Sequence, residues 1–240
     1  MRKLWEKEYA LRASDFDKYN HIKPSSVLDL FQDAAAQHAI ETGVGYDDLI
    51  GRSYIWVLLK VKFKIISDPQ KFQKVTVKTW PLEPNKFIYR REYCIENESG
   101  KRLIVGSSEW VIIHSEKRRL VPNTKLYDFA DGFHPEMMFE EKLEKVDDFE
   151  PSGTPRIVNA GFCEIDVNNH VNNTKYANYV LDAVVPSEAD ELVDFQIDYR
   201  KEVLEGTELK IYHKKDENVV LAKGLNNNGD IMFACRLEYK

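Results

Sequence analysis

The chain has 240 residues with a net charge of −6, and 43% of its residues are hydrophobic and 31% charged. This composition is typical of a globular protein with one large or two small domains, and the negative charge argues against nucleic acid as the main partner, because phosphate binding needs a broad basic surface. We expect a cytoplasmic protein with reduced thiols and no stable membrane insertion, because the sequence has no signal peptide, only three scattered cysteines and no membrane-length apolar run.

The first expected helix follows the polar segment DKYNHIKPSSVLDLF, residues 17–31. Its apolar residues recur at the spacing of a helix that packs one face on a core: Val27, Leu30, Phe31, Ala34 and Ala35. Ser25 or Ser26 is the expected N-cap. Alternation and β-branched or aromatic residues then predict four strands, at 56–65, 74–80, 86–96 and 103–113.

A less regular segment separates the two halves of the chain. Residues 121–155 are acidic and show no alternation, so we interpret them as a connector with one short helix at most. The segment DVNNHVNNTKYANYV at 166–180 then predicts a second amphipathic helix, with Asn173 or Thr174 as the expected N-cap. Four more strands are expected, at 194–202, 207–213, 218–225 and 230–239.

The two halves repeat each other at an offset of 149 residues, which is the separation of Asp17 from Asp166. Nineteen positions compared at this offset contain five identities, where average composition gives about one. The residues of the first half that recur are Asp17, Asn20, His21, Asp33 and Ala34. In the strands, we match Phe63 to Tyr199 at an offset of 136, so Ile66 is the expected counterpart of Glu202 in the first half.

The repeat predicts an α+β fold of two tandem units, each with a short strand, a long helix and about four antiparallel strands wrapped around that helix. We place the first unit at residues 1–120, the connector at 121–155 and the second unit at 156–240. The two sheets are expected to join edge to edge into one continuous sheet, because joining removes exposed strand edges.

The sequence resembles the acyl-acyl carrier protein (acyl-ACP) thioesterases, a family with a double hotdog fold. The resemblance rests on four segments: DVNNHVNNTKYANYV, IDYRKEV at 197–203, YIWVLLKVKF at 54–63 and SSEWVIIHSEKRRLVPN at 107–123. It implies hydrolysis of the thioester between a fatty acyl chain and the phosphopantetheine arm of acyl carrier protein, without a cofactor. It also implies four catalytic positions: Asp166, Asn168, His170 and Glu202.

One position departs from the family pattern. Many members have a cysteine after the glutamate, whereas this chain has Val203. A cysteine nucleophile at that position is therefore excluded, and Cys163 does not replace it by motif.

A thioester has a good leaving group, so the enzyme chiefly needs an activated oxygen nucleophile and donors for the oxyanion. Asp166 is the expected nucleophile, or the base on an attacking water, and the sequence leaves this choice open. Asn168 is expected to hold the water or the carbonyl. His170 and Glu202 are expected to form a hydrogen-bonded pair that moves protons. Backbone N–H groups near residue 173 are the expected oxyanion donors.

Each of these residues also has an ordinary structural explanation. Asp and Asn are common in capping turns, and Glu202 fits a solvated strand end. The combination of the two motifs is what favours catalysis. A metal site is discounted, because one histidine with amide and carboxylate neighbours is a poor set of transition-metal ligands.

The first half has Tyr19 in place of Asn168 and Ile66 in place of Glu202, so we expect it to have lost catalysis. The resemblance suggests that it houses the acyl chain instead, with ordinary core packing as the alternative for the residues concerned: Phe31, Ala34 and Ala35. A basic run offers a docking site for an acidic carrier protein, with a solvated charge run as the alternative: Lys117, Arg118 and Arg119.

Two other functions stay open at this stage: an acyl-CoA thioesterase on the same fold, and a non-catalytic acyl-binding or sensor protein. The four polar residues retained in one half argue against the second of these. Chain-length preference, saturation preference and the formation of a homodimer are also left open by the sequence.

Overall fold

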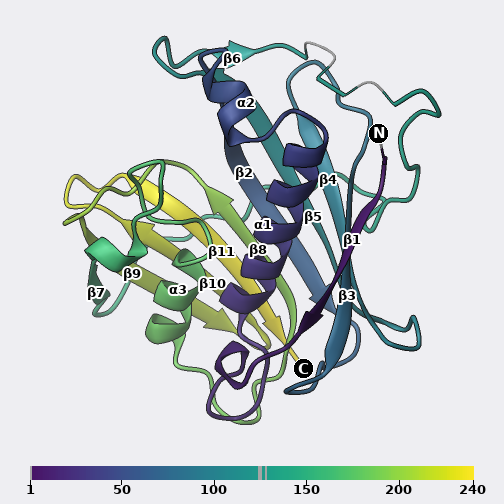
Figure 1. Ribbon diagram of the computed structural model, residues 1–240. Coiled ribbons are helices and arrows are strands. Elements are labelled where there is room, and N and C mark those ends of the chain that lie inside the picture. Colours follow the sequence, from purple (N-terminus) through teal and green to yellow (C-terminus); the bar gives the residue numbers. More distant parts are fainter. Residues whose placement is uncertain (1, 124–125, 128) are drawn as a thin grey trace. The chain divides into compact units, whose positions relative to one another are not determined.

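The computed structural model describes the whole chain except residues 1, 124–125 and 128 (Figure 1). The chain divides into two compact units. The first consists of Met1–Asp15 and Leu28–Leu143, and the second of Phe16–Val27 and Glu144–Lys240. The polar segment at the start of the first helix therefore packs with the second half of the chain. Among the described residues, no helix has the length and apolar character needed to cross a membrane.

The first unit is an antiparallel sheet with a helix along one face (Figure 1). Its strands are β1 (Trp5–Ala10), β2 (Tyr54–Ile65), β3 (Lys74–Pro81), β4 (Tyr89–Asn97), β5 (Arg102–His114) and β6 (Leu120–Val121). They follow the order β1-β3-β4-β5-β2, and β6 pairs with β5. The helices are α1 (Pro24–Glu41), which belongs to this unit from Leu28 onward, α2 (Tyr46–Ile50) and the short 3-10 helix η1 (Ala13–Asp15).

A glycine in β5 decides how closely α1 approaches this sheet. The Phe31 ring stacks on Tyr93, with 4.2 Å between the ring centroids. A Cβ atom added at Gly106 would lie 2.3 Å from the Phe31 ring, which is far inside van der Waals contact. The absence of a side chain at Gly106 therefore leaves the space that the Phe31 ring of α1 occupies.

The second unit is built in the same way. Its strands are β7 (Arg156–Asn159), β8 (Leu192–Tyr199), β9 (Glu208–Asp216), β10 (Val219–Leu225) and β11 (Ile231–Tyr239). They follow the order β8-β11-β10-β9-β7, and all are antiparallel. The helices are α3 (Tyr176–Val184) and the 3-10 helix η2 (Phe162–Glu164). The predicted α+β class is confirmed in both units.

The eight long strands predicted from alternation are confirmed, each to within about three residues at either end. The predicted N-caps are wrong. α1 already begins at Pro24, ahead of both candidate serines, because proline suits the first helical position, where its missing N–H is not needed. α3 begins later than expected, because Asn172 holds the preceding turn: its Oδ1 accepts from the N–H and the hydroxyl of Thr174, at 3.0 and 2.9 Å.

The connector forms no helix in its described residues, and it is held by side chains of the strands. In the first unit, the Met138 N–H donates to Glu92 Oε2 at 2.7 Å, and Lys60 Nζ donates to the Leu143 carbonyl at 2.9 Å. In the second unit, the Val146 N–H donates to Asp198 Oδ2 at 2.9 Å. Strand side chains thus satisfy main-chain groups of the connector, although the connector forms little regular secondary structure.

Candidate active site

The segment 165–171 of the second unit folds into a tight turn that presents its polar side chains. The Asp166 N–H donates to the His170 carbonyl at 2.9 Å, and the Asn169 N–H donates to the Asp166 carbonyl at 3.0 Å. Asn169 has φ 64°, in the left-handed region that asparagine tolerates better than most residues. Asp166 Oδ1 accepts from the Asn168 N–H at 2.8 Å. The Asp-x-Asn-x-His pattern therefore encodes this turn as well as its functional groups.

The turn fixes the tautomer of His170. Its Nδ1 lies 3.2 Å from the Val171 carbonyl, which can only accept, so Nδ1 carries the proton. The same Nδ1 lies 3.9 Å from Asp166 Oδ1. In the neutral ring Nε2 is then the acceptor, so a hydrogen bond between Nε2 and an ionised Glu202 requires the ring protonated on both nitrogens.

Glu202 reaches the same region from the end of β8. The Val171 N–H donates to the Val203 carbonyl at 2.8 Å, which ties the turn to the residue after Glu202. Val203 is fully buried and Glu202 is exposed. The Val171–Val203 bond joins the two segments, which lie about thirty residues apart in the sequence.

A buried tyrosine stands between these segments, and the sequence analysis did not single it out. Burial raises the pKa of the Tyr176 hydroxyl, a hydrogen bond with the Val203 backbone lowers it, and the charges of Asp166 and Glu202 raise it further. Both carboxylates thus act on one hydroxyl. The only signal in the sequence was an aromatic residue at the first apolar position of the helix.

The expected oxyanion donors are partly used by the protein itself. The Lys175 N–H donates to the Asn172 carbonyl at 2.9 Å, and the Thr174 N–H donates to the Asn172 side chain. These two amides are therefore occupied, because the helix begins after them and a turn precedes it.

Three exposed apolar side chains border this region, and sequence reasoning missed them too. Phe162, Val167 and Leu204 are 78%, 79% and 57% exposed. Their segments are adjacent, because the Gly206 N–H donates to the Ala160 carbonyl at 2.8 Å. The sequence contained one signal for this group, which was the apolar Val167 in an otherwise polar turn.

The first polar segment adopts the same turn, which supports the repeat. The Asp17 N–H donates to the His21 carbonyl at 2.9 Å, Asn20 has φ 68°, and Asp17 Oδ1 accepts from the Tyr19 N–H at 2.8 Å. The isolated bridges Phe16–Ile22 and Ile165–Val171 lie 149 residues apart, as do η1 and η2. The offset of 149 holds for the three-dimensional structure.

The offset of the strands, however, is 134 and not 136. The Leu11 N–H donates to the Gln73 carbonyl, and Ala160 makes the equivalent bond to Thr207. The bonds Phe72 to Leu11 and Gly206 to Ala160 agree with this register.

The expectation that Ile66 answers to Glu202 is therefore wrong, and the equivalent residue is Asp68. The error arose because Phe63 and Tyr199 were matched by residue type, whereas the ladder pairs fix the register. The first copy thus keeps the chemical class at three of the four counterparts. Asp17 and Asp68 are acids, His21 is a histidine, and Tyr19 is the one change of class.

The other predicted residues lie in the first unit. Phe31, Ala34 and Ala35 are buried on the sheet-facing side of α1. Lys117, Arg118 and Arg119 are exposed in the turn between β5 and β6, where the His114 N–H donates to the Arg119 carbonyl.

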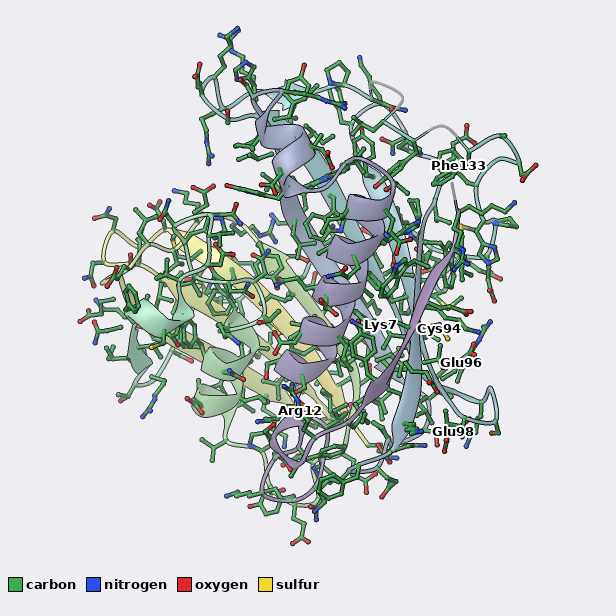
Figure 2. All side chains as sticks on the ribbon, in the orientation of Figure 1. Lys7, Arg12, Cys94, Glu96, Glu98 and Phe133 are labelled. Carbon is green, nitrogen blue, oxygen red and sulfur yellow. The ribbon has the colours of Figure 1, made fainter. Side chains whose placement is uncertain are left out.

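The cysteines are free thiols in the described structure. Cys94 and Glu96 lie on β4 (Figure 2), with Cys94 Sγ 3.6 Å from Glu96 Oε1. Burial raises the pKa of the Cys94 thiol to about 12, and burial also raises the pKa of Cys235. Neither thiol is suited to act as a nucleophile, because only the thiolate attacks efficiently.

Family models match both halves of the chain. The model of the acyl-ACP thioesterase N-terminal domain matches residues 2–127, and that of the acyl-ACP thioesterase C-terminal domain matches residues 155–240. The chain is 25% identical over 214 residues to a chloroplastic palmitoyl-acyl carrier protein thioesterase of Cuphea hookeriana, and 26% identical over 219 residues to one of Arabidopsis thaliana. Each alignment covers 83% of this chain and 52% of the relative, so the chain spans about half the length of these curated relatives.

Solved structures match over nearly the whole chain. An acyl-ACP thioesterase from Bacteroides thetaiotaomicron superposes with a TM-score of 0.91 at 21% identity, covering 99% of this chain and 98% of that one. A 12:0-ACP thioesterase from Umbellularia californica superposes with a TM-score of 0.89 at 19% identity, covering 100% and 98%. At these identities the likeness shows the fold, and it confirms the fold that the resemblance implied.

Proposed function

Because the chain belongs to the acyl-ACP thioesterase family, we propose that it hydrolyses the thioester between a fatty acyl chain and acyl carrier protein, releasing fatty acid and the carrier thiol. The observation that carries this proposal is the convergence of two motifs in the second unit. It is supported by the Val171–Val203 hydrogen bond, which joins the turn that contains Asp166 and His170 to the segment that contains Glu202.

The proposed chemistry uses these groups in sequence. Asp166 either takes a proton from a water that attacks the thioester carbonyl carbon, or attacks that carbon itself and forms an acyl anhydride, which a water then hydrolyses to release the fatty acid. Asn168 orients the water or the carbonyl, and its exposed side chain is free of the core. When the carbon–sulfur bond breaks, the His170–Glu202 pair delivers a proton to the departing sulfur. General acid–base help of this kind contributes about 10²–10⁴-fold to the rate.

The partner would be an acidic carrier protein, which the exposed basic turn in the first unit suits by charge. Reversing Lys117, Arg118 and Arg119 to glutamate is expected to lower kcat/KM on acyl-ACP about tenfold or more at low ionic strength, and to leave hydrolysis of a short acyl-pantetheine thioester unchanged. The measurement is thiol release from both substrates, and from acyl-CoA, at low and high salt.

A matched control reverses three lysines of β9 instead: Lys210, Lys214 and Lys215. An equal loss in the control, or no loss in the test variant, would contradict the docking role. Activity on acyl-CoA that exceeds activity on acyl-ACP would favour the acyl-CoA thioesterase. No thiol release from any substrate would favour the acyl-binding protein.

We also propose that the helix face of the first unit limits the length of the acyl chain. Ala34 is fully buried, so a larger side chain takes space from whatever lies against α1. Ala34→Val is expected to shift the preferred substrate to a shorter chain, measured as the ratio of kcat/KM values over acyl-ACPs of graded length.

Ala183→Val is the control, because Ala183 answers to Ala34 in the second helix at the offset of 149. An unchanged length profile in an Ala34→Val variant that keeps its melting temperature would assign Ala34 to ordinary core packing.

A further inference from the structure

A turn in the first unit carries a large apolar side chain where glycine is usual. In residues 70–73 the Gln73 N–H donates to the Gln70 carbonyl at 3.1 Å, and Phe72, the third residue of the turn, has φ 64°. This φ suits glycine and is strained for a bulky residue. The turn is held in place, because the Phe72 N–H donates to the Leu11 carbonyl and the Leu11 N–H donates to the Gln73 carbonyl, both at 3.0 Å. Phe72 is therefore fixed in a conformation that disfavours it.

The second copy forms the same turn with glycine. The Thr207 N–H donates to the Leu204 carbonyl at 3.1 Å, and Gly206, which answers to Phe72 at the offset of 134, has φ 76°. The fold therefore does not require an aromatic residue at this point. Burial does not compensate for the strain either, because 73% of Phe72 is exposed. An exposed phenylalanine in a strained turn indicates a contact outside the chain.

The loop around this turn is apolar and basic. Ile66, at the other end of the loop between β2 and β3, is 58% exposed. Residues 64–74 contain three exposed lysines and one acid, whereas their counterparts 198–208 contain four acids and two basic residues. The two copies thus carry loops of opposite charge, and the loop of the first copy attracts anions. Its lysines are Lys64, Lys71 and Lys74, and its acid is Asp68.

This loop is separate from the basic turn that we propose for the carrier protein. β2 and β5 pair from Tyr54 with His114 at one end to Ile65 with Ile104 at the other. The loop follows Ile65, whereas the basic turn follows His114, so the two basic segments lie at opposite ends of these strands. The 12 residues of β2 separate them by about 35 Å. One small partner is therefore not expected to cover both.

We propose that the loop 66–73 attaches the protein reversibly to an anionic lipid surface, with Phe72 and Ile66 among the lipid head groups and the three lysines paired with head-group charges. A stable protein interface buries about 800 Å² on each partner around an apolar core, which two protruding side chains do not supply. A bilayer interface takes up single apolar side chains, and anionic lipids attract lysines close to the surface. The attachment goes beyond thioester hydrolysis and does not depend on it.

Co-sedimentation with lipid vesicles measures this attachment directly. The wild type is expected to bind vesicles of phosphatidylcholine and phosphatidylglycerol, and to bind pure phosphatidylcholine vesicles about tenfold less or weaker still. Phe72→Gly is expected to lower the partition coefficient on the anionic vesicles about tenfold, because burying a phenylalanine side chain contributes about that much. Its melting temperature is expected to stay the same or rise, since glycine fits φ 64° without strain.

Two further variants test the apolar and the basic side chains separately. Phe162→Ala is the matched control, because Phe162 is 78% exposed in the second unit, and it is expected to leave vesicle binding unchanged. Lys71→Glu combined with Lys74→Glu is expected to remove binding to the anionic vesicles. The proposal is overturned by equal losses in Phe72→Gly and Phe162→Ala, by unchanged binding in Phe72→Gly or in the double lysine variant, or by a wild type that does not bind.

A second readout keeps an aromatic side chain in the turn. Phe72→Trp is expected to shift its added fluorescence to shorter wavelength on anionic vesicles, and Phe162→Trp is expected to show no such shift. An unshifted signal at position 72 would overturn the lipid contact.

The competing partner is an acidic protein. A fall of kcat/KM on acyl-ACP in Phe72→Gly, measured without vesicles, would assign the loop to the carrier and would also overturn the lipid contact. Because vesicle binding needs no thioester, its outcome is independent of whether the protein hydrolyses one.

Discussion

Asp166→Asn is expected to lower kcat on acyl-ACP by about 10²–10⁴-fold, the usual contribution of a catalytic acid or base. The substitution keeps an oxygen that can accept from the Asn168 N–H, so the turn is expected to stay intact. The loss would then be one of charge and basicity. Thiol release from acyl-ACP measures it, and the circular dichroism spectrum and melting temperature confirm that the variant folds.

The repeat supplies a control that few enzymes offer. Asp17→Asn makes the same change in a turn with the same hydrogen bonds, and it is expected to leave kcat within about twofold. His170→Ala and His21→Ala form a second matched pair. Full activity in Asp166→Asn and His170→Ala would remove the catalytic assignment, and equal losses in both copies would show that the first copy also takes part.

The second large effect is expected at a buried carboxylate of the first unit. Glu92 on β4 is fully buried, and three donors use its oxygens: Arg90 Nε at 2.6 Å, Ser107 Oγ at 2.7 Å and the Met138 N–H at 2.7 Å. Burial raises the pKa of Glu92, and the bonds from Ser107, Arg90 and Met138 offset part of that rise.

Glu92→Ala removes the carboxylate that all three donors share, which is also the acid beside the Arg90 charge. The expected loss is about 3–5 kcal/mol of the free energy of unfolding, typical of breaking a buried ion pair from one side. For a chain of this size, that loss corresponds to a fall of about ten degrees in melting temperature. Urea denaturation and calorimetry measure the two quantities.

Glu96→Ala is the control for this prediction. Glu96 lies on the same strand and face, but its carboxylate is hydrogen-bonded to Lys78 Nζ at 2.7 Å in a pair that solvent partly reaches. About 1 kcal/mol or less is expected there. Equal losses of stability in the two variants would mean that the effect of Glu92→Ala comes from changing a residue of β4, and not from losing the hydrogen bonds to the Glu92 carboxylate.

The sequence predicted the regular elements well, because their signal is local. Alternation and the i, i+3, i+4 pattern report which side of a strand or helix is buried, and this needs no knowledge of distant contacts. The helix starts were predicted less well. Pro24 and Asn172 compete with the nearby serines and threonine for the same role, and local propensity does not rank them.

The candidate site was predicted in part for a related reason. Asp166 and His170 are close in sequence and share one turn, so their proximity could be inferred directly. Glu202 could be added only through the family resemblance. The residue of the first half that corresponds to Glu202 is Asp68, and finding it requires knowing which backbone groups pair across the sheet. Residue types alone do not contain that register. The position of Tyr176 also depends on contacts with distant segments.

The way the connector is held has a consequence for how its sequence can change. The strands recognise carbonyl oxygens and N–H groups, which every residue except proline carries in full, as with Lys60 on the Leu143 carbonyl. Exposed positions such as Glu140 and Lys142 can therefore be substituted during evolution without loss of the hydrogen bonds that hold the connector. Proline is the one substitution that this form of recognition forbids at Met138 and Val146, because each gives up its N–H to a buried acid.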